Sequence, residues 1–167
     1  MNRQAALTEF FEQFGLAYSS LNVDSVTSTF IMPFTTNVNG DITHWTEFEP
    51  LRQTTEMLFS WYYQQGFRNA HYEIVDQVFV GSDHATVELR WHVAREDQHY
   101  WIHYTGYQLR WVDAGWKICG IMQISTPEKS DLPFNSENSE AWSPLALAEA
   151  ALGHEIHRPN NHPTNNE

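Results

Sequence analysis

One histidine of this chain lies in a pattern that could support acid–base chemistry. Residues 85–93 alternate strictly between apolar and polar types, which predicts a strand with one buried face that includes Trp91. A second alternating run, 99–112, places His103 beside Tyr107 on the matching face. An imidazole titrates near neutral pH and can act as a general acid or base. The sequence therefore predicts His103 as the catalytic candidate, with a hydrogen-bonded histidine in a structural core as the alternative.

The phase of the second run has two interpretations. In the first, the alternation in the second half of the run extends unchanged to its beginning. The inward residues are then Trp101, His103, Thr105, Tyr107, Leu109 and Trp111. In the second, a two-residue turn pairs Trp91 with Ile102, and the inward residues at its start are Tyr100, Ile102 and Tyr104. A loop with an odd number of residues around Glu96–Asp97, or a bulge, favours the first interpretation.

Aromatic side chains make up 14% of the chain and could either fill a core or wall a cavity. Tyr18 lies on an apolar helix stripe, which is typical of a core residue whose hydroxyl reaches the rim of a pocket. Trp45 follows His44 at the end of a predicted hairpin, where a pocket mouth and a surface loop are both compatible with the pattern. The predicted ligand-binding residues are Trp91, Trp101, Thr105, Tyr107, Tyr18 and Trp45.

Metal and nucleophile chemistry are disfavoured by spacing. His99 and His103 share a strand face but lie ~13 Å apart, too far for one ion. The segment 154–157 (HEIH) lacks the spacing of a zinc protease motif. The chain has no glycine-rich phosphate loop and no serine in a nucleophile elbow, and Cys119 fits a buried thiol. We expect neither a metal nor a cofactor.

The composition limits the partners. The chain has 167 residues with 9 basic and 21 acidic side chains, a net charge of −12, which disfavours binding to nucleic acid. The chain has no stretch of about 18 apolar residues that would predict a membrane span. Glu9 and Glu12 interrupt the apolar stretch that a signal peptide requires. A single cysteine excludes an internal disulfide. We therefore expect a cytoplasmic protein.

The elements that would position these residues form an α+β pattern of helices followed by an antiparallel sheet. An apolar stripe predicts a helix over 2–21, and Asn22 caps a short helix over 23–30. Asn39-Gly40 predicts a hairpin turn, and Thr46 with Glu49 resembles a capping box that opens a long helix to Gly66. The predicted strands are 34–38, 41–45, 71–80, 85–93, 99–112 and 116–124.

Two parts of the chain differ in composition. Residues 1–125 carry the periodic patterns and are predicted to form one domain. Residues 126–167 are rich in Pro, Asn, Ser and Glu, which predicts an acidic, partly disordered tail. Within it, a cap, a proline and apolar spacing predict a short helix near 144–152.

Several motifs carry a resemblance to a known fold family. They are Leu21-Asn22-Val23-Asp24, Asn39-Gly40, Gly81-Ser82-Asp83-His84-Ala85, Tyr107-Gln108-Leu109-Arg110-Trp111 and Ala114-Gly115-Trp116-Lys117-Ile118. Residues 1–125 thereby resemble the nuclear-transport-factor-two-like superfamily, in its SnoaL-like branch of polyketide cyclases and ketosteroid isomerases. The resemblance implies a cone-shaped sheet curled around a long helix and a pocket.

The same resemblance argues against isomerase chemistry. The positions that carry the isomerases' oxyanion-hole tyrosine, acid and base fall at Phe14, near Thr105, and near Asn37 or Val38. None of these residues supplies the required group. The chain therefore resembles the branch without its isomerase catalytic residues.

Two functions follow from these observations. The first is binding of a small hydrophobic or aromatic molecule, with an acid–base enzyme of the isomerase, cyclase or dehydratase type as one form of it. The second is a non-enzymatic binding or interaction module whose outer sheet face pairs with a second copy, as a homodimer, or with another partner. On that face we expect an exposed aromatic, either Trp101 or Tyr104, beside Arg90 and His92.

Overall fold

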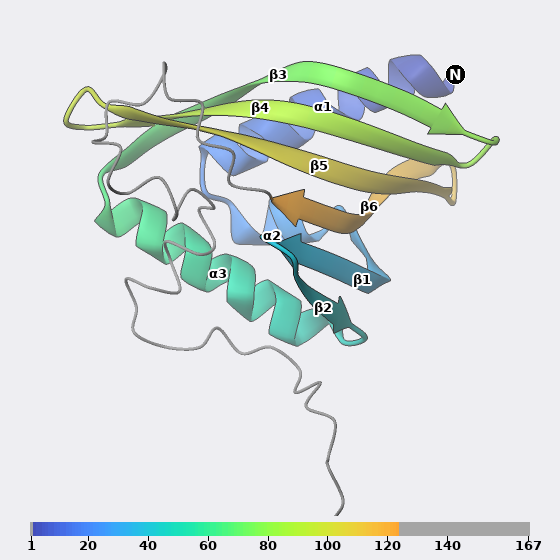
Figure 1. Cartoon of the computed structure of the whole chain (residues 1–167), viewed down its shortest axis with the longest axis horizontal. Helices are drawn as coiled ribbons and strands as arrows, with labels where there is room; N and C mark the ends of the chain where they lie inside the picture. Colours follow the sequence, from blue (N-terminus) through green and yellow to red (C-terminus); the bar gives the residue numbers. More distant parts are fainter. Residues whose placement is uncertain (1, 124–167) are drawn as a thin grey trace, which may run out of the picture.

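The computed structural model describes residues 2–123, which form the mixed α+β fold that the sequence predicts (Figure 1). The acidic tail 126–167 and the short helix expected near 144–152 lie outside the described residues. The helices are α1 (Arg3–Ser19), α2 (Val23–Thr27) and α3 (Phe48–Gln64). The strands are β1 (Phe30–Val38), β2 (Asp41–Trp45), β3 (Phe67–Val80), β4 (His84–Arg95), β5 (Tyr100–Val112) and β6 (Gly115–Gln123). None of the helices in this described part is both long and apolar enough to span a membrane.

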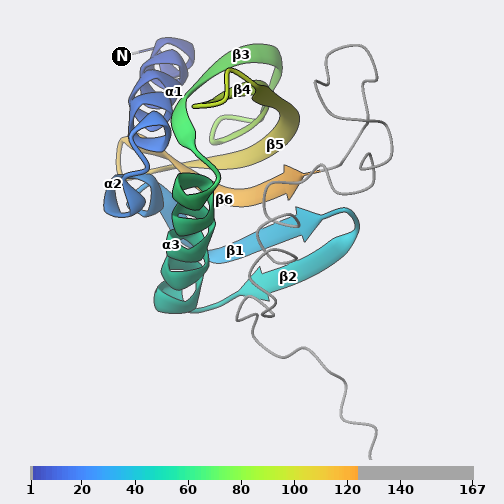
Figure 2. The same ribbon diagram turned by 90° about the vertical axis from the view of Figure 1, so that its left-hand side faces the viewer.

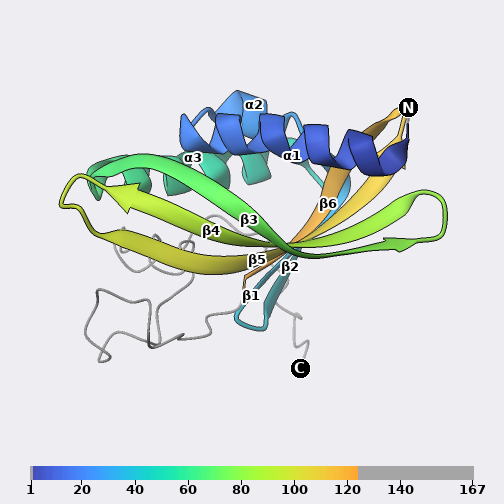
Figure 3. The same cartoon turned by 90° about the horizontal axis from the view of Figure 1, so that it is seen from above.

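The strands form one curved sheet in the order β2-β1-β6-β5-β4-β3, which does not close on itself (Figure 2). Neighbouring strands are antiparallel except β1 and β6, which run parallel. All three helices cover the same face of the sheet (Figure 3). We call this the inner face and the opposite one the outer face.

The N-terminal helices follow the predicted stripe but end earlier than expected. The side chain of Asn2 caps α1 by accepting from the Gln4 N–H at 3.0 Å. The predicted helix over 23–30 stops at Thr27, and Phe30 already belongs to β1. The helix ends early because the next residues join the sheet. The Ile118 N–H donates to the Thr29 carbonyl at 2.8 Å, which places this segment beside β6.

The predicted capping box of α3 is wrong. Glu47 is the N-cap residue, with extended backbone angles and no side-chain cap, so the helix begins after the Thr46 position that the motif requires. Pro50 nevertheless lies in the first turn of α3, where its missing N–H costs no helical hydrogen bond.

The turn between β4 and β5 settles the phase of β5. It holds three residues, 96–98, between Arg95 and His99, whose backbones pair at 2.9 Å, and Gln98 adopts a φ of 64°. This odd loop pairs Trp91 with His103 and puts both on the inner face. The alternative phase is wrong: Tyr100, Ile102 and Tyr104 alternate with the inward residues and lie on the outer face.

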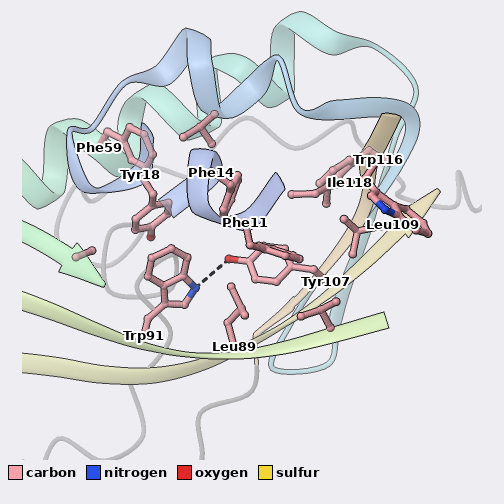
Figure 4. Close-up of a cluster of buried hydrophobic side chains, with 14 of the residues drawn as sticks. Phe11, Phe14, Tyr18, Phe59, Leu89, Trp91, Tyr107, Leu109, Trp116 and Ile118 are labelled. Atoms are coloured by element: carbon pink, nitrogen blue, oxygen red, sulfur yellow. Dashed lines mark hydrogen bonds between the residues drawn. The ribbon is translucent and has the colours of Figure 1, made fainter. Parts of the chain in front are cut away.

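Aromatic side chains fill the space between the helices and the inner face (Figure 4). The rings of Tyr18 and Trp91 stack with centroids 4.5 Å apart, and Phe14 meets Tyr107 edge to face at 5.5 Å. Gly15 lets α1 approach β3, because a Cβ at this position would lie 2.6 Å from the ring of Tyr72. Ring contacts thus fasten the helix layer to the sheet.

A chain that ends after Ser125 is expected to fold on its own. Every helix and strand described above, and the whole aromatic cluster, lies before that point. We expect the truncated and full chains to show the same near-UV circular dichroism and a difference in unfolding free energy of at most a few kcal/mol. Loss of the cooperative unfolding transition in the truncated chain would mean that the domain extends into 126–167.

Candidate functional site

Every predicted ligand-binding residue is buried in the structure. His103 and Thr105 on β5 point to the inner face with Trp101 and Tyr107, and Trp91 lies opposite His103 on β4. Tyr18 comes from α1 and stacks on Trp91. Trp45 is 2% exposed at the end of β2, so it belongs to the core and not to a surface loop. The structure therefore brings the set to one side of the sheet, although its binding roles stay predictions.

The polar groups of the aromatic residues Trp91, Tyr107 and Tyr18 have hydrogen-bond partners within the core. The Trp91 indole N–H donates to the Tyr107 hydroxyl at 3.0 Å (Figure 4), and the Tyr18 hydroxyl donates to that of Tyr62 at 3.1 Å. Burial raises the pKa of Tyr18 to about 12, against a smaller lowering by the Tyr62 hydrogen bond, and burial likewise raises the pKa of Tyr62 and Tyr107. These phenols remain neutral and serve as structural hydrogen-bonding groups.

The other half of the set contains polar groups without partners. His103 is 6% exposed, and neither ring nitrogen has a hydrogen-bond partner in the part of the chain that the structure describes. The indole N–H of Trp61, on α3, also lacks a partner there. Thr105 Oγ1 likewise has no partner within hydrogen-bond distance and angle among the described residues, although Thr105 lies near enough to the Tyr107 hydroxyl to lower its pKa. We call Trp61, His103 and Thr105 the polar end of the core.

The polar end lies where β5 extends past β6. Strand β6 finishes at Gln123, opposite Thr105, so His103 stands two residues beyond the last β5–β6 pair. Trp61 reaches the same region from α3, because its ring stacks on that of Trp101 with centroids 5.3 Å apart. The sequence places Trp61 on the apolar stripe of α3, but only the three-dimensional contact marks it as a site residue.

His103 is neutral at physiological pH. Burial, with a smaller repulsion from His92, lowers the pKa of its imidazole from 6.5 to about 3. The expectation that this imidazole titrates near neutrality is therefore wrong for the folded protein. A neutral imidazole offers one N–H donor and one nitrogen acceptor, which suits hydrogen bonding better than proton transfer at pH 7.

The outer face carries Tyr104, one of the two aromatics considered for it, while Trp101 points inward. Tyr104 is half-buried and not exposed as expected, whereas Tyr100 on the same face is 44% exposed. The homodimer predicted through this face stays a prediction. Within residues 2–123, no three His, Cys, Asp or Glu side chains gather closely enough to hold a metal ion.

Comparisons with known proteins address the fold and the family. A family model described as NTF2-like protein (DUF6841) matches residues 4–126. Among solved structures, a Mycobacterium tuberculosis protein of unknown function aligns with a TM-score of 0.61 and 15% identity, covering 90% of this chain and 86% of its own. A Nostoc punctiforme protein with a cystatin-like fold aligns with a TM-score of 0.56 and 20% identity, covering 78% and 93%.

A third solved structure bears the name of an enzyme. It is a Novosphingobium aromaticivorans protein whose name assigns it to the scytalone dehydratases, with a TM-score of 0.56, 12% identity, and coverage of 72% of this chain and 82% of its own. No curated protein sequence matches this chain. At these identities the structural likeness concerns the fold alone.

Acid should destabilise the protein through His103. Below pH 6.5 the unfolded chain binds a proton at this position that the folded chain, with a pKa of about 3, does not bind. The unfolding free energy should then fall by about 1.4 kcal/mol per pH unit from this group alone. Urea unfolding at pH 7 and at pH 5 measures how much unfolding free energy the protein loses between these two pH values. This loss should be smaller by roughly 2 kcal/mol in His103→Phe than in the wild type.

The exposed His44 provides the control for this measurement. His44→Phe should keep the wild-type pH dependence, because residue 44 is exposed on β2 and lies outside the core. Equal pH dependence in His103→Phe and the wild type would show that the imidazole at position 103 is hydrated in solution.

Proposed function

This chain belongs to the NTF2-like protein family DUF6841, and on that premise we propose that its interior binds a small hydrophobic or aromatic molecule whose polar group pairs with the polar end of the core. The observation that carries the proposal is the set of buried polar atoms on Trp61, His103 and Thr105 that have no hydrogen-bond partner among residues 2–123. A buried polar group left unsatisfied costs about 1–3 kcal/mol. A ligand that supplies the missing hydrogen bonds would recover this free energy on binding.

The donor and acceptor inventory describes the ligand. Trp61 can only donate, the hydroxyl of Thr105 can do both, and neutral His103 has one donor and one acceptor. The surrounding surface is aromatic, with Trp101 stacked against Trp61 and Trp91 opposite His103. A hydroxyl or carbonyl group on a flat apolar body matches this inventory, since both can accept from the indole N–H.

The low pKa of His103 favours binding over acid–base catalysis. A group with a pKa of about 3 is a weak base, and its protonated form is absent at neutral pH. The scytalone dehydratase name among the structural neighbours is compatible with an aromatic, oxygen-bearing ligand. Its dehydration chemistry is not part of the function proposed for this chain.

A hydroxyl group on an aromatic probe should strengthen binding. We expect 1-naphthol to quench the tryptophan fluorescence of the protein and to bind more tightly than naphthalene, with affinities that do not change between pH 5.5 and 7.5. In His103→Phe, which keeps a ring of similar volume, naphthalene binding should survive. The preference for 1-naphthol should fall by roughly 1–3 kcal/mol, about 5- to 150-fold in the affinity ratio.

The variant His44→Phe again serves as the control and should bind both probes like the wild type. The proposal fails if neither probe quenches the fluorescence of the wild type. It also fails if His103→Phe discriminates between the two probes as well as the wild type does.

A further inference from the structure

A hollow of about 610 Å³ lies on the outer face of the sheet, away from the helices. The residues around it come from five strands: Thr35, Asn37, Ile42, Thr86, Glu88, Tyr104, Gly106, Gln108, Gly120, Ile121 and Met122. Strand register places all of them except Ile121 on the outer face, because they pair with one another and alternate with the buried residues. The volume falls within the range of small-molecule sites, roughly 300–1,000 Å³.

Two glycines create the floor of this hollow. Gly106 on β5 pairs with Met122, and Gly120 on β6 pairs with Gln108, so two adjacent strands lack side chains in diagonal positions. A Cβ at Gly120 would lie 2.9 Å from Oε1 of Gln108, whose side chain therefore reaches over this glycine. A Cβ at Gly106 would lie 3.8 Å from its nearest neighbour, the Cβ of Met122, so a side chain there would make ordinary van der Waals contact without a clash.

The walls combine apolar surface with one negative charge. Ile42 and Met122 are 53% and 41% exposed, and the half-buried Tyr104 adds an aromatic ring. Glu88 stands opposite Gly106 and forms no ion pair with the described part of the chain. The next outward residue on β4, Arg90, is directed to Glu73, with N···O at 3.5 Å.

We propose that this outer hollow binds a small organic cation, with its apolar body against Ile42, Tyr104 and Met122 and its ammonium group at Glu88. The carboxylate supplies the opposite charge, and the ring of Tyr104 can face the cation. The net charge of −12 raises the local concentration of cations and repels anions. The site is separate from the polar end of the core, which is buried on the inner face of the sheet.

Tryptamine tests the charge preference. By isothermal titration at low salt, we expect tryptamine to bind more tightly than the uncharged indole-3-ethanol, and indole-3-acetate to bind least. Glu88→Gln should weaken tryptamine binding about fivefold, as expected for an exposed ion pair, and remove its advantage over the alcohol. Glu73→Gln removes the same charge from the same face outside the hollow and should leave tryptamine binding within about twofold of wild type.

Filling the hollow tests its location. Gly106→Ile places a side chain in the hollow from a position where a Cβ meets no clash, and it should abolish tryptamine binding while the circular dichroism spectrum is kept. His103→Phe should bind tryptamine like the wild type, which separates this site from the interior one. If Gly106→Ile does not fold, Glu88→Gln and Glu73→Gln decide the question alone.

Three results would overturn the proposal. The first is no detectable binding of tryptamine to the wild type, and the second is equal binding to the wild type and Glu88→Gln. The third is occupation of the hollow by a second copy of the chain: light scattering would then give a dimer for the wild type and a monomer for Gly106→Ile, with no effect of tryptamine on either.

Discussion

The contact on which the rest of the structure depends is the one that Trp91 makes with Tyr18 and Tyr107. The indole of Trp91 stacks on Tyr18 from α1 and donates its N–H to Tyr107 on β5. One side chain thereby joins the helix layer to the sheet and links the neighbouring strands β4 and β5. Because Trp91 is fully buried, these contacts are shielded from water, and the ring positions of Phe14 and Phe11 follow from them.

This contact also divides the interior into two regions. Around Trp91 each buried hydroxyl or N–H has a partner, so this region is a core in the ordinary sense. At the polar end, Trp61 and His103 are equally buried but have no partners among the described residues. The polar end therefore differs from the rest of the core in its hydrogen bonds and not in its burial.

Much of the fold could be predicted because it depends on short-range patterns. The apolar stripe of α1, the Asn39-Gly40 hairpin and the alternation in β4 and β5 all appear where the sequence places them. The phase of β5 stayed open because adding or removing one residue in the loop 96–98 would reverse it. Gln98 in this loop takes a left-handed conformation, which a glutamine in the sequence does not predict. The capping box failed because Glu47, and not Thr46, is the N-cap residue of α3, and its side chain forms no cap hydrogen bond.

The site was harder to predict than the fold. Alternation correctly put His103 on the inner face, but its pKa and missing partners depend on α3 and on where β6 ends. Trp61 carried no signal beyond an apolar stripe. The outer hollow arises from Gly106 and Gly120 on different strands, and their diagonal placement follows only from the register between β5 and β6.

The parallel pairing of β1 with β6 has a consequence for how the chain folds. Strands β3 to β6 are each joined to the next by a short turn, so their contacts are local in sequence. Phe30, by contrast, lies opposite Ile118, and this contact closes a loop that contains most of the domain. Loop closure costs entropy before the contact stabilises the chain, and such long-range pairings slow folding. The β1–β2 hairpin should therefore join a sheet whose other four strands have already assembled, and a chain emerging from the ribosome cannot complete this sheet until β6 has been synthesised.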